Sequence, residues 1–334
     1  MSDLRAVTRV LSRDICYNIN ENTIEEIRIR VDRPVILKYP EGKEDILDHV
    51  VTQNEILNIL QSLCNNSIYS YQSQICDGYI TLQGGHRVGI TGNIAMKDGK
   101  ITNVNYVSSL NFRIAREIIG ASDEILKEVI TRKSNSASQN NYRIYPNDVN
   151  MNNQNNNRNS NVENNDISNL EINNTLIVSR PGCGKTTVLR DLVRNISNMG
   201  FTVSLIDERG EIASMYKGIP QNDIGLRTDV MDNVTKSLGM KIAVRTMAPQ
   251  VIVADEIGTE GDLEAINYGI CSGVKGIFTA HGSDISELRQ NETLNKLYEE
   301  KLFERIIFLE NRGKMGKVYY LDRNMYKTVD GKMV

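Results

Sequence analysis

The segment from residue 179 to residue 187 has the composition of a loop that binds phosphate groups. Its glycines would let backbone N–H groups face phosphate oxygens, and the helix that follows would add the partial positive charge of its N-terminus. The Lys185 side chain could reach the outer phosphates, and the Thr186 hydroxyl could bind Mg²⁺. We therefore expect a Walker A loop that binds ATP. Its expected residues are Ser179, Arg180, Pro181, Gly182, Cys183, Gly184, Lys185, Thr186 and Thr187, with Ser179 where the pattern's first glycine usually stands.

A pair of acids, Asp255 and Glu256, ends the apolar run of residues 251–254. A carboxylate at the tip of such a strand can share Mg²⁺ with Thr186, and a second carboxylate can polarise the attacking water. Acid pairs at strand ends also cap helices, but this pair follows a phosphate loop in the same chain. We therefore predict that Asp255 is a Mg²⁺ ligand and that Glu256 is the catalytic carboxylate.

Two further sets of polar residues follow apolar runs. Asp207 and Glu208 come after residues 203–206, and His281 comes after residues 277–280. The carboxyl ends of parallel strands gather at one edge of a sheet, where ligands bind. We therefore predict that Glu208 and His281 act at the same site, with His281 as a donor to the outer phosphate. The alternatives are a surface acid for Glu208 and a turn or capping residue for His281.

Arginines could complete the site from a neighbouring subunit, because a cation supplied in trans stabilises the charge that develops during phosphoryl transfer. Any one of them could instead be a plain surface or salt-bridge residue. The candidates are Arg113, Arg116, Arg209, Arg227 and Arg245.

The elements that would position these residues alternate between short apolar runs and helical patterns in the C-terminal part of the chain. Such alternation predicts an α/β fold with a mainly parallel sheet and helices on both faces. The expected strands are 175–178, 202–206, 251–254 and 276–280. The expected helices are 186–198, 231–247, 259–272 and 286–301, with a closing hairpin of 306–309 and 318–321.

The N-terminal part has the pattern of a smaller α+β domain. Thr52 and Glu55 form a capping box that opens a helix, and Asp98-Gly99 is typical of a hairpin turn. Ser122 is expected to cap a short helix that runs through Ile130. The expected strands are 27–31, 34–39, 79–82 and 86–91, and the glycines between residues 84 and 92 are expected in turns and bulges.

A change of composition separates the two parts. Residues 134–174 include 17 asparagines among 41 residues and have almost nothing to bury, which predicts a disordered linker. Asparagine-rich tracts can alternatively drive assembly. The predicted domains are therefore 1–133, an asparagine-rich insert at 134–174, and 175–334.

Composition argues against several classes of function. A formal net charge of −3 gives no general attraction to nucleic acid or anionic membranes. The 5 cysteines form no C-x-x-C pair and there are 3 histidines, so neither a disulfide framework nor a zinc site is expected. There is no secretory signal pattern and no apolar stretch of roughly 18 residues. We expect a cytoplasmic protein that meets a membrane only through a protein partner.

With these motifs in view, the chain resembles the stage III sporulation protein AA family, within the wider group of type II/IV secretion ATPases. The resemblance lies in both parts of the chain, outside the asparagine-rich insert. The segments that carry it are residues 84–89, 108–117, 184–187, 189–191, 207–209, 227–230, 255–258 and 279–282.

The resemblance implies a RecA-like domain that hydrolyses MgATP behind a smaller N-terminal domain, assembled as a homo-hexameric ring. It places Asp207 and Glu208 in the Asp box of secretion ATPases and His281 in their His box. It also implies action on the mother-cell side of the forespore membrane, where a membrane-embedded partner would form a secretion-like channel.

Three alternatives to a motor ATPase share the phosphate loop. A small-molecule kinase would need a lid rich in arginine, which we do not find. A nucleic-acid-stimulated RecA-like ATPase would need a basic cluster, which the residues after His281 lack. An assembly scaffold that binds nucleotide without hydrolysing it would fit Ser179 in place of glycine.

Overall fold

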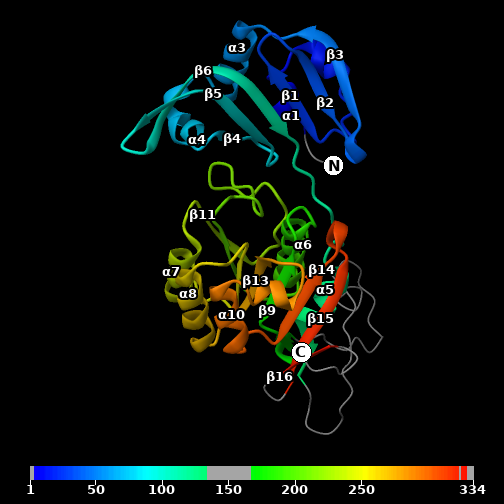
Figure 1. The fold of residues 1–334 in the computed structure, drawn as a ribbon, viewed down its shortest axis with the longest axis vertical. Coiled ribbons are helices and arrows are strands. Elements are labelled where there is room, and N and C mark those ends of the chain that lie inside the picture. Colours follow the sequence, from blue (N-terminus) through cyan, green and yellow to red (C-terminus); the bar gives the residue numbers. More distant parts are fainter. Residues whose placement is uncertain (1–3, 134–166, 323–324, 329–334) are drawn as a thin grey trace, which may run out of the picture. The chain divides into compact units, whose positions relative to one another are not determined.

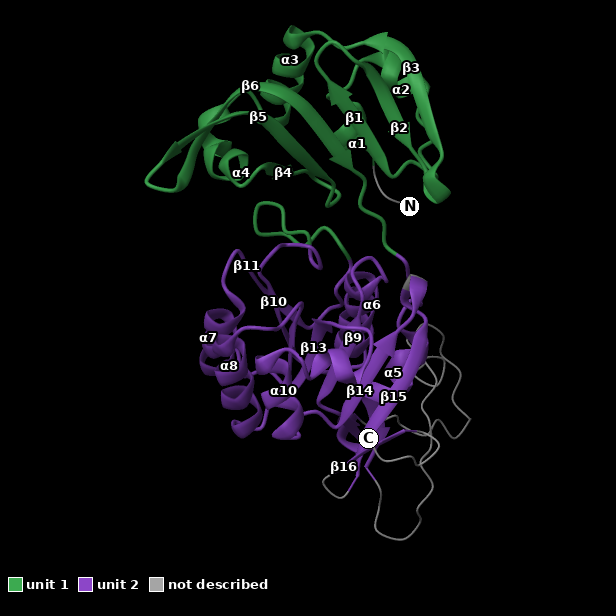
Figure 2. Ribbon diagram, viewed as in Figure 1, with its two compact units in different colours: residues 1–117, 214–222 green, residues 118–213, 223–334 purple. Residues whose placement is uncertain are grey.

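The computed structural model describes residues 4–133, 167–322 and 325–328 of the 334-residue chain (Figure 1). The chain forms two compact units, shown in Figure 2. Unit 1 consists of residues 1–117 and 214–222, and unit 2 of residues 118–213 and 223–334. Each unit has its own sheet and its own apolar core.

Unit 1 is built on an antiparallel sheet of six strands. Apolar and polar residues alternate along these strands, so that Ile27 and Ile29 are fully buried while Arg28 between them is only half-buried. One face of the sheet therefore forms the core and the other is polar. The spatial order is β3 (Glu44–Val50), β2 (Pro34–Lys38), β1 (Glu26–Arg30), β6 (Lys100–Arg113), β5 (Arg87–Lys97) and β4 (Tyr79–Thr81).

Short helices cover the buried face of this sheet. The predicted capping box is confirmed, since Thr52 and Glu55 exchange both hydrogen bonds at the start of α3, which buries Ile56 and Leu60 against the core. The predicted turn is also confirmed: Asp98 and Gly99 have φ values of 52° and 74°, as a two-residue hairpin turn requires. The helices are α1 (Arg5–Thr8), α2 (Arg13–Tyr17), α3 (Gln53–Leu63) and α4 (Gln72–Cys76).

A segment distant in sequence completes unit 1. Residues 214–222 belong to it, although the chain on either side belongs to unit 2 (Figure 2). The Gln221 side chain accepts a hydrogen bond of 2.8 Å from the N–H of Gly84. Gly85, at φ +76°, lies so close to this segment that a Cβ there would be 3.0 Å from the Cβ of Ser214.

Unit 2 contains a sheet of eight strands, of which the first six in spatial order are parallel. The order is β11 (Thr228–Asp232), β10 (Val203–Asp207), β12 (Val251–Ala254), β13 (Lys275–His281), β9 (Thr175–Ser179), β14 (Arg305–Leu309), β15 (Met315–Asp322) and β16 (Met325–Thr328). The central strands are buried along their whole length, as strands covered on both faces must be. The predicted α/β class and the mainly parallel sheet are thus confirmed.

The helices of unit 2 connect these strands and pack on the sheet. Side chains of β9 and β12 share one core with residues of α7, α8 and α10, and α6 contacts β9 and β10. The helices are α5 (Asp123–Val129), α6 (Lys185–Asn198), α7 (Lys236–Thr246), α8 (Glu260–Cys271), α9 (Ile285–Leu288) and α10 (Glu292–Glu299). None of the helices in the described ranges combines the length and hydropathy that a bilayer-spanning segment requires.

The structure differs from the predicted domain boundary at residue 133. Unit 1 ends at Glu117, and α5 belongs to unit 2, where it contacts α6 and β14. The reason is a buried polar anchor. The N–H and the hydroxyl of Ser122 both donate to Asp191 of α6, at 2.9 and 2.8 Å. Ser122 therefore precedes α5 as predicted, but its side chain bonds to α6 rather than capping α5.

The end of the predicted linker is also ordered. β7 (Ile130–Arg132) pairs antiparallel with β8 (Leu170–Ile172), so the last part of the predicted insert belongs to a two-stranded ribbon of unit 2. Asn173 donates to the carbonyls of Glu128 and Val129, and these buried contacts explain why asparagines here are not solvated. Residues 134–166 of the predicted linker lie outside the described part of the chain.

Candidate nucleotide site at the strand tips

The loop between β9 and α6 has the backbone that phosphate binding requires. Gly182 and Gly184 adopt φ values of 77° and 95°, a left-handed conformation that side chains with a Cβ disfavour. Gly184 is the N-cap of α6, so the first N–H groups of this 14-residue helix point into the loop. The glycine-rich pattern therefore forms a concave N–H surface that suits an anion.

Ser179, where the sequence pattern lacks its first glycine, fits this loop without strain. It is the last residue of β9 and is buried, and its hydroxyl donates to the Arg180 carbonyl at 2.9 Å. Arg180 and Pro181 are exposed beside it, and Cys183 is buried at the base of the loop. The N–H of Gly313, in the loop between β14 and β15, donates to the Cys183 carbonyl at 2.6 Å.

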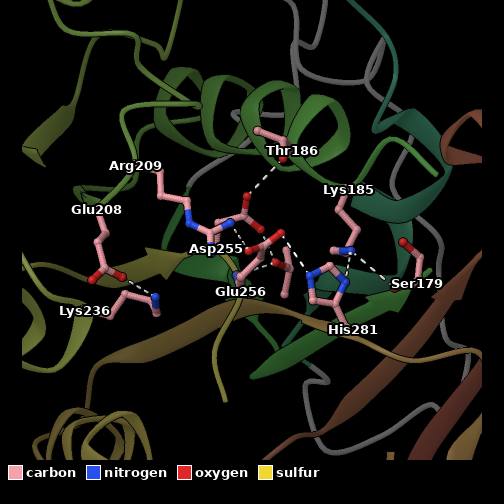
Figure 3. Close-up of polar contacts among 10 residues, drawn as sticks. Ser179, Lys185, Thr186, Glu208, Arg209, Lys236, Asp255, Glu256 and His281 are labelled. Carbon is pink, nitrogen blue, oxygen red and sulfur yellow. Dashed lines mark hydrogen bonds and ion pairs between the residues drawn. The ribbon is translucent and has the colours of Figure 1, made fainter. Parts of the chain in front are cut away.

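The Lys185 ammonium lies at the mouth of the loop. It contacts the Ser179 carbonyl at 3.2 Å and Nδ1 of His281 at 3.0 Å (Figure 3). Burial lowers the pKa of Lys185, and the nearby carboxylates of Asp255 and Glu256 oppose that shift. A bound phosphate would add further negative charge beside this buried cation and favour its charged form.

Asp255 meets the first turn of α6 directly. The Thr186 hydroxyl donates to its Oδ2 at 3.0 Å (Figure 3). The Thr279 hydroxyl donates to its Oδ1. Burial raises the pKa of Asp255, although both hydroxyl bonds act in the opposite direction. The predicted pair of Thr186 and Asp255 is therefore brought together by the structure.

These oxygens fit a Mg²⁺ ion. Mg²⁺ prefers hard oxygen ligands and is usually held by one or two protein groups together with phosphates. A buried carboxylate beside a hydroxyl matches that description, and Asp255 would be stabilised by a cation. No cluster of three or more His, Cys, Asp or Glu side chains suited to a metal occurs within the described ranges. The ion would be shared between Thr186, Asp255 and the nucleotide.

Glu256 is held by two cationic or donor groups. Its Oε1 lies 3.1 Å from Nε2 of His281, and its Oε2 accepts a hydrogen bond from Nη1 of Arg209 (Figure 3). Its φ of 52° is unusual for a residue with a side chain, and such strain persists only where surrounding contacts fix it. The N–H of Glu256 donates to the Thr279 hydroxyl at 2.8 Å, which is one such contact.

His281 therefore bridges the phosphate loop and the acid pair. With Lys185 donating to Nδ1, the ring proton belongs on Nε2, from which it reaches Glu256. The bridge follows from strand register, because His281 of β13 lies opposite Ser179 of β9.

Glu208 lies farther along the same edge, and its carboxylate pairs with Lys236 at the start of α7 (Figure 3). Asp207 has a different role. Its carboxylate accepts hydrogen bonds from the N–H groups of Glu211, Ile212 and Ala213, at 2.8 to 3.2 Å. This buried clamp fixes the loop that carries Glu208 and Arg209.

Of the five candidate arginines, the structure places Arg209 at this site, within its own chain. Arg227 directly precedes β11 and so lies at the amino ends of the strands, away from the strand tips. Arg245 lies near the end of α7 over the ring of Tyr268. Arg113 and Arg116 belong to unit 1, where Arg116 donates to the Ile24 carbonyl at 2.7 Å.

Two residues at the site were not predicted from the sequence. Thr279 bonds to both acids, and Lys236 pairs with Glu208. A signal for Thr279 existed, since it is a polar residue in the middle of an apolar strand that ends in His281. Lys236 carried no comparable signal, because a lysine in the first turn of a polar helix is unremarkable in sequence.

The chain is similar to a known family of proteins. The family model described as "Sporulation stage III, protein AA" matches residues 4–144 and 144–327. Stage III sporulation protein AA of Bacillus subtilis is 33% identical over 317 residues, which cover 92% of this chain and 90% of that protein.

Solved structures show the fold of this chain to be that of RecA-like secretion ATPases. The ATPase DotB of Legionella pneumophila has a TM-score of 0.50 and 14% identity, over 98% of this chain and 78% of that chain. The pilus retraction motor PilT with bound ADP has a TM-score of 0.51 and 13% identity, over 88% and 76%. Matched along both of its parts by the family model and by a relative of the same name, this chain belongs to the stage III sporulation protein AA family.

Proposed function

We propose that unit 2 binds MgATP at the tips of β9, β10, β12 and β13 and hydrolyses it. The observation that carries the proposal is the convergence of five side chains at one edge of the sheet through hydrogen bonds and ion pairs: Lys185, Thr186, Asp255, Glu256 and His281. Three separate loops, those that follow β9, β12 and β13, supply these groups.

Each residue has a role that its position supports. The loop N–H groups and Lys185 would bind the phosphates, and Thr186 with Asp255 would hold Mg²⁺. When bound, that ion would neutralise charge on the phosphate oxygens. Glu256 would orient water and accept its proton, and His281 and Arg209 would fix the direction of that carboxylate. Glu208 would act from the next strand tip.

The test of hydrolysis is Glu256→Gln, which preserves shape and removes the basic oxygen. Turnover should fall by roughly 10²- to 10⁴-fold while binding of a fluorescent ATP analogue is retained. Lys185→Ala should lose binding itself. A Glu256→Gln protein that releases phosphate at the wild-type rate would contradict the catalytic role, and a wild-type protein that binds ATP without turnover would favour the scaffold alternative.

The biological task is proposed from family membership and from likeness of fold. The family's sporulation name and the secretion and pilus ATPases of the same fold support a motor of a secretion-like channel in endospore formation. The chain would act as a homo-hexamer in the mother-cell cytoplasm, held at the forespore membrane by a membrane-embedded partner. Mass measurement with and without a slowly hydrolysed ATP analogue would test ring assembly, and a monomer in both conditions would contradict it.

A further inference from the structure

A two-stranded arm extends from the sheet of unit 1. It consists of residues 91–107, the parts of β5 and β6 that continue past their neighbours to the turn at Asp98 and Gly99 (Figure 1). The arm exposes large apolar side chains: Met96 is 64% exposed and Tyr106 is 84% exposed. Apolar groups concentrated on an extended hairpin indicate a surface that another molecule covers.

The direction of the arm is fixed by a bulge at its base. Gly92 lies so close to the other strand that a Cβ there would be 2.7 Å from the Asn105 carbonyl oxygen. Opposite it, Tyr106 has a φ of 46°, and the strand register shifts between Thr91 and Asn93. A bulge of this kind bends the strand and changes its direction, so the backbone at the base fixes the orientation of the arm.

Two lysines and one aspartate lie at the tip of the arm, Lys97, Lys100 and Asp98, so its net charge is positive. Lys97 and Lys100 face each other across the turn, and both are exposed. Like charges directly opposite one another destabilise a hairpin. An acidic surface placed against the tip would relieve that repulsion.

A surface with the complementary properties lies at the other end of the same sheet. β3 is the edge strand, and among the described strands it pairs only with β2. It exposes Ile46 (64%) and Val50 (57%), and Asp45 and Asp48 are exposed beside them. Edge strands present unpaired backbone groups and are natural sites for a further strand.

We propose that the arm of one copy of this chain docks on the β3 edge of a second copy. Met96 and Tyr106 would pack against Ile46 and Val50, while the tip lysines would face Asp45 and Asp48. The two halves of the complementary pair are on one chain, which is why the partner is a second copy. This proposal adds a contact surface to the homo-hexamer of the proposed function. It rests on the proposed function only in assuming that the chain assembles with itself.

The two patches differ and lie at opposite ends of the sheet (Figure 1), so the contact would be head to tail. Head-to-tail contacts propagate from copy to copy and close into a ring when the rotation permits. Isologous dimers do not have this property. The surface therefore suits a ring and gives unit 1 a part in holding it together.

Reversing charges on each side gives a direct test. An arm-reversed protein (K97E/K100E) presents acid to acid, and an edge-reversed protein (D45K/D48K) presents base to base, so each alone should remain monomeric by sedimentation velocity. Mixed in equal amounts they should assemble, because every contact in the mixture is again between opposite charges. The protein with all four changes should assemble by itself.

The matched control is D229K/E264K, which reverses two exposed acids of unit 2, outside both patches, and should assemble as wild type does. The proposal is overturned by reversed proteins that assemble alone, by a mixture that stays monomeric, or by a wild-type monomer at all concentrations. Binding of the fluorescent ATP analogue, measured on the same proteins, reports on unit 2. Loss of assembly with intact nucleotide binding, or the reverse, therefore separates failure of this proposal from failure of the proposed function.

Discussion

Thr279 occupies the position on which the geometry of both acids depends. Its hydroxyl donates to Asp255 and accepts the N–H of Glu256, so one oxygen sets the place of the expected Mg²⁺ ligand and of the expected catalytic carboxylate. Thr279 is fully buried, and water cannot replace it. A group that acts in this way positions other residues without touching substrate.

Replacing Thr279 by valine keeps the shape and removes the hydroxyl. The Asp255 oxygen and the Glu256 N–H would then lose a buried partner, which should lower the free energy of unfolding by about 1–3 kcal/mol and reduce ATP turnover. Thr279→Ser keeps the hydroxyl and should retain turnover despite the lost methyl group. Equal loss of turnover in both variants would point to packing and would contradict a positioning role.

Asp255 should make stability depend on pH with a definite sign. Its pKa is raised above the ordinary 3.8 by burial, so over the window just above that value the folded state holds a proton that the unfolded state has lost. Its contribution to stability is therefore full below the unfolded pKa and lost as pH rises through the folded one.

Asp255→Asn cannot titrate, and it should remove this dependence. Measured by denaturant unfolding without nucleotide, the difference in stability between Asp255→Asn and wild type should increase in favour of the variant as pH rises from acid toward neutral. Parallel curves for the two proteins would show that the carboxyl does not titrate with a raised pKa.

At the scale of elements, the loop between β14 and β15 supports the phosphate loop. Gly313 donates to the Cys183 carbonyl, has a φ of 72°, and would place a Cβ 2.8 Å from Cγ2 of Val188 in α6. This close approach makes the conformation of the phosphate loop depend on a hairpin that contributes no catalytic group.

Gly313→Ala should therefore weaken nucleotide binding as well as stability. The left-handed backbone alone costs about 1–2 kcal/mol for a residue with a Cβ, and displacement of the loop adds to it. Gly273→Ala is the control, since Gly273 has a similar φ of +84° with nothing within 4 Å of its Cβ position. The melting temperature should fall in both variants, whereas affinity for the fluorescent ATP analogue should fall only in Gly313→Ala. Equal affinity in the two would refute the support role.

Elements with strong apolar patterns could be predicted from the sequence, and those shaped by tertiary contacts could not. The phosphate loop, β12 and β13 follow from local pattern. β11 is not among the expected strands, and the helix expected from residue 231 begins at Lys236, because Thr228–Asp232 is a polar edge strand whose pairing with β10 no local signal encodes. The helix expected at 286–301 is two helices, since Asn291 caps a new one.

The site divides in the same way. Strand tips at Asp207, Asp255 and His281 could be placed at one edge because parallel strands share direction. The partners of those tips depend on side-chain reach across strands, so the bond from Arg209 to Glu256 and the pairing of Glu208 with Lys236 required the structure.

At the scale of the whole molecule, the ribbon of β7 and β8 joins the chain on either side of residues 134–166. Lys133 donates to the Asn169 carbonyl at 2.8 Å beyond the pairs of β7 and β8, so the two ends of the insert are held side by side. The chain segments on either side of residues 134–166 therefore meet through contacts of their own.

Deleting residues 134–166 and joining Lys133 to Ile167 by a short glycine-serine turn should leave unit 2 folded. Loop-closure entropy predicts a gain of about 0.6 kcal/mol for each halving of loop length. Denaturant unfolding and ATP turnover would be compared with the full chain. Loss of stability on deletion would show that the insert contributes to the folded state.

Because residues 214–222 belong to unit 1, recombination between related genes should be restricted. A gene fragment ending at residue 117 encodes every strand of the antiparallel sheet but omits Ser214 and Gln221, which meet the turn at Gly84 and Gly85. The two units are interleaved along the chain, so a recombination joint between them would separate residues that must fit together. We expect functional chimaeras of related chains only where residues 1–117 and 214–222 come from the same parent. Since residues 214–222 lie within the stretch that encodes unit 2, the two units should evolve together as one gene segment.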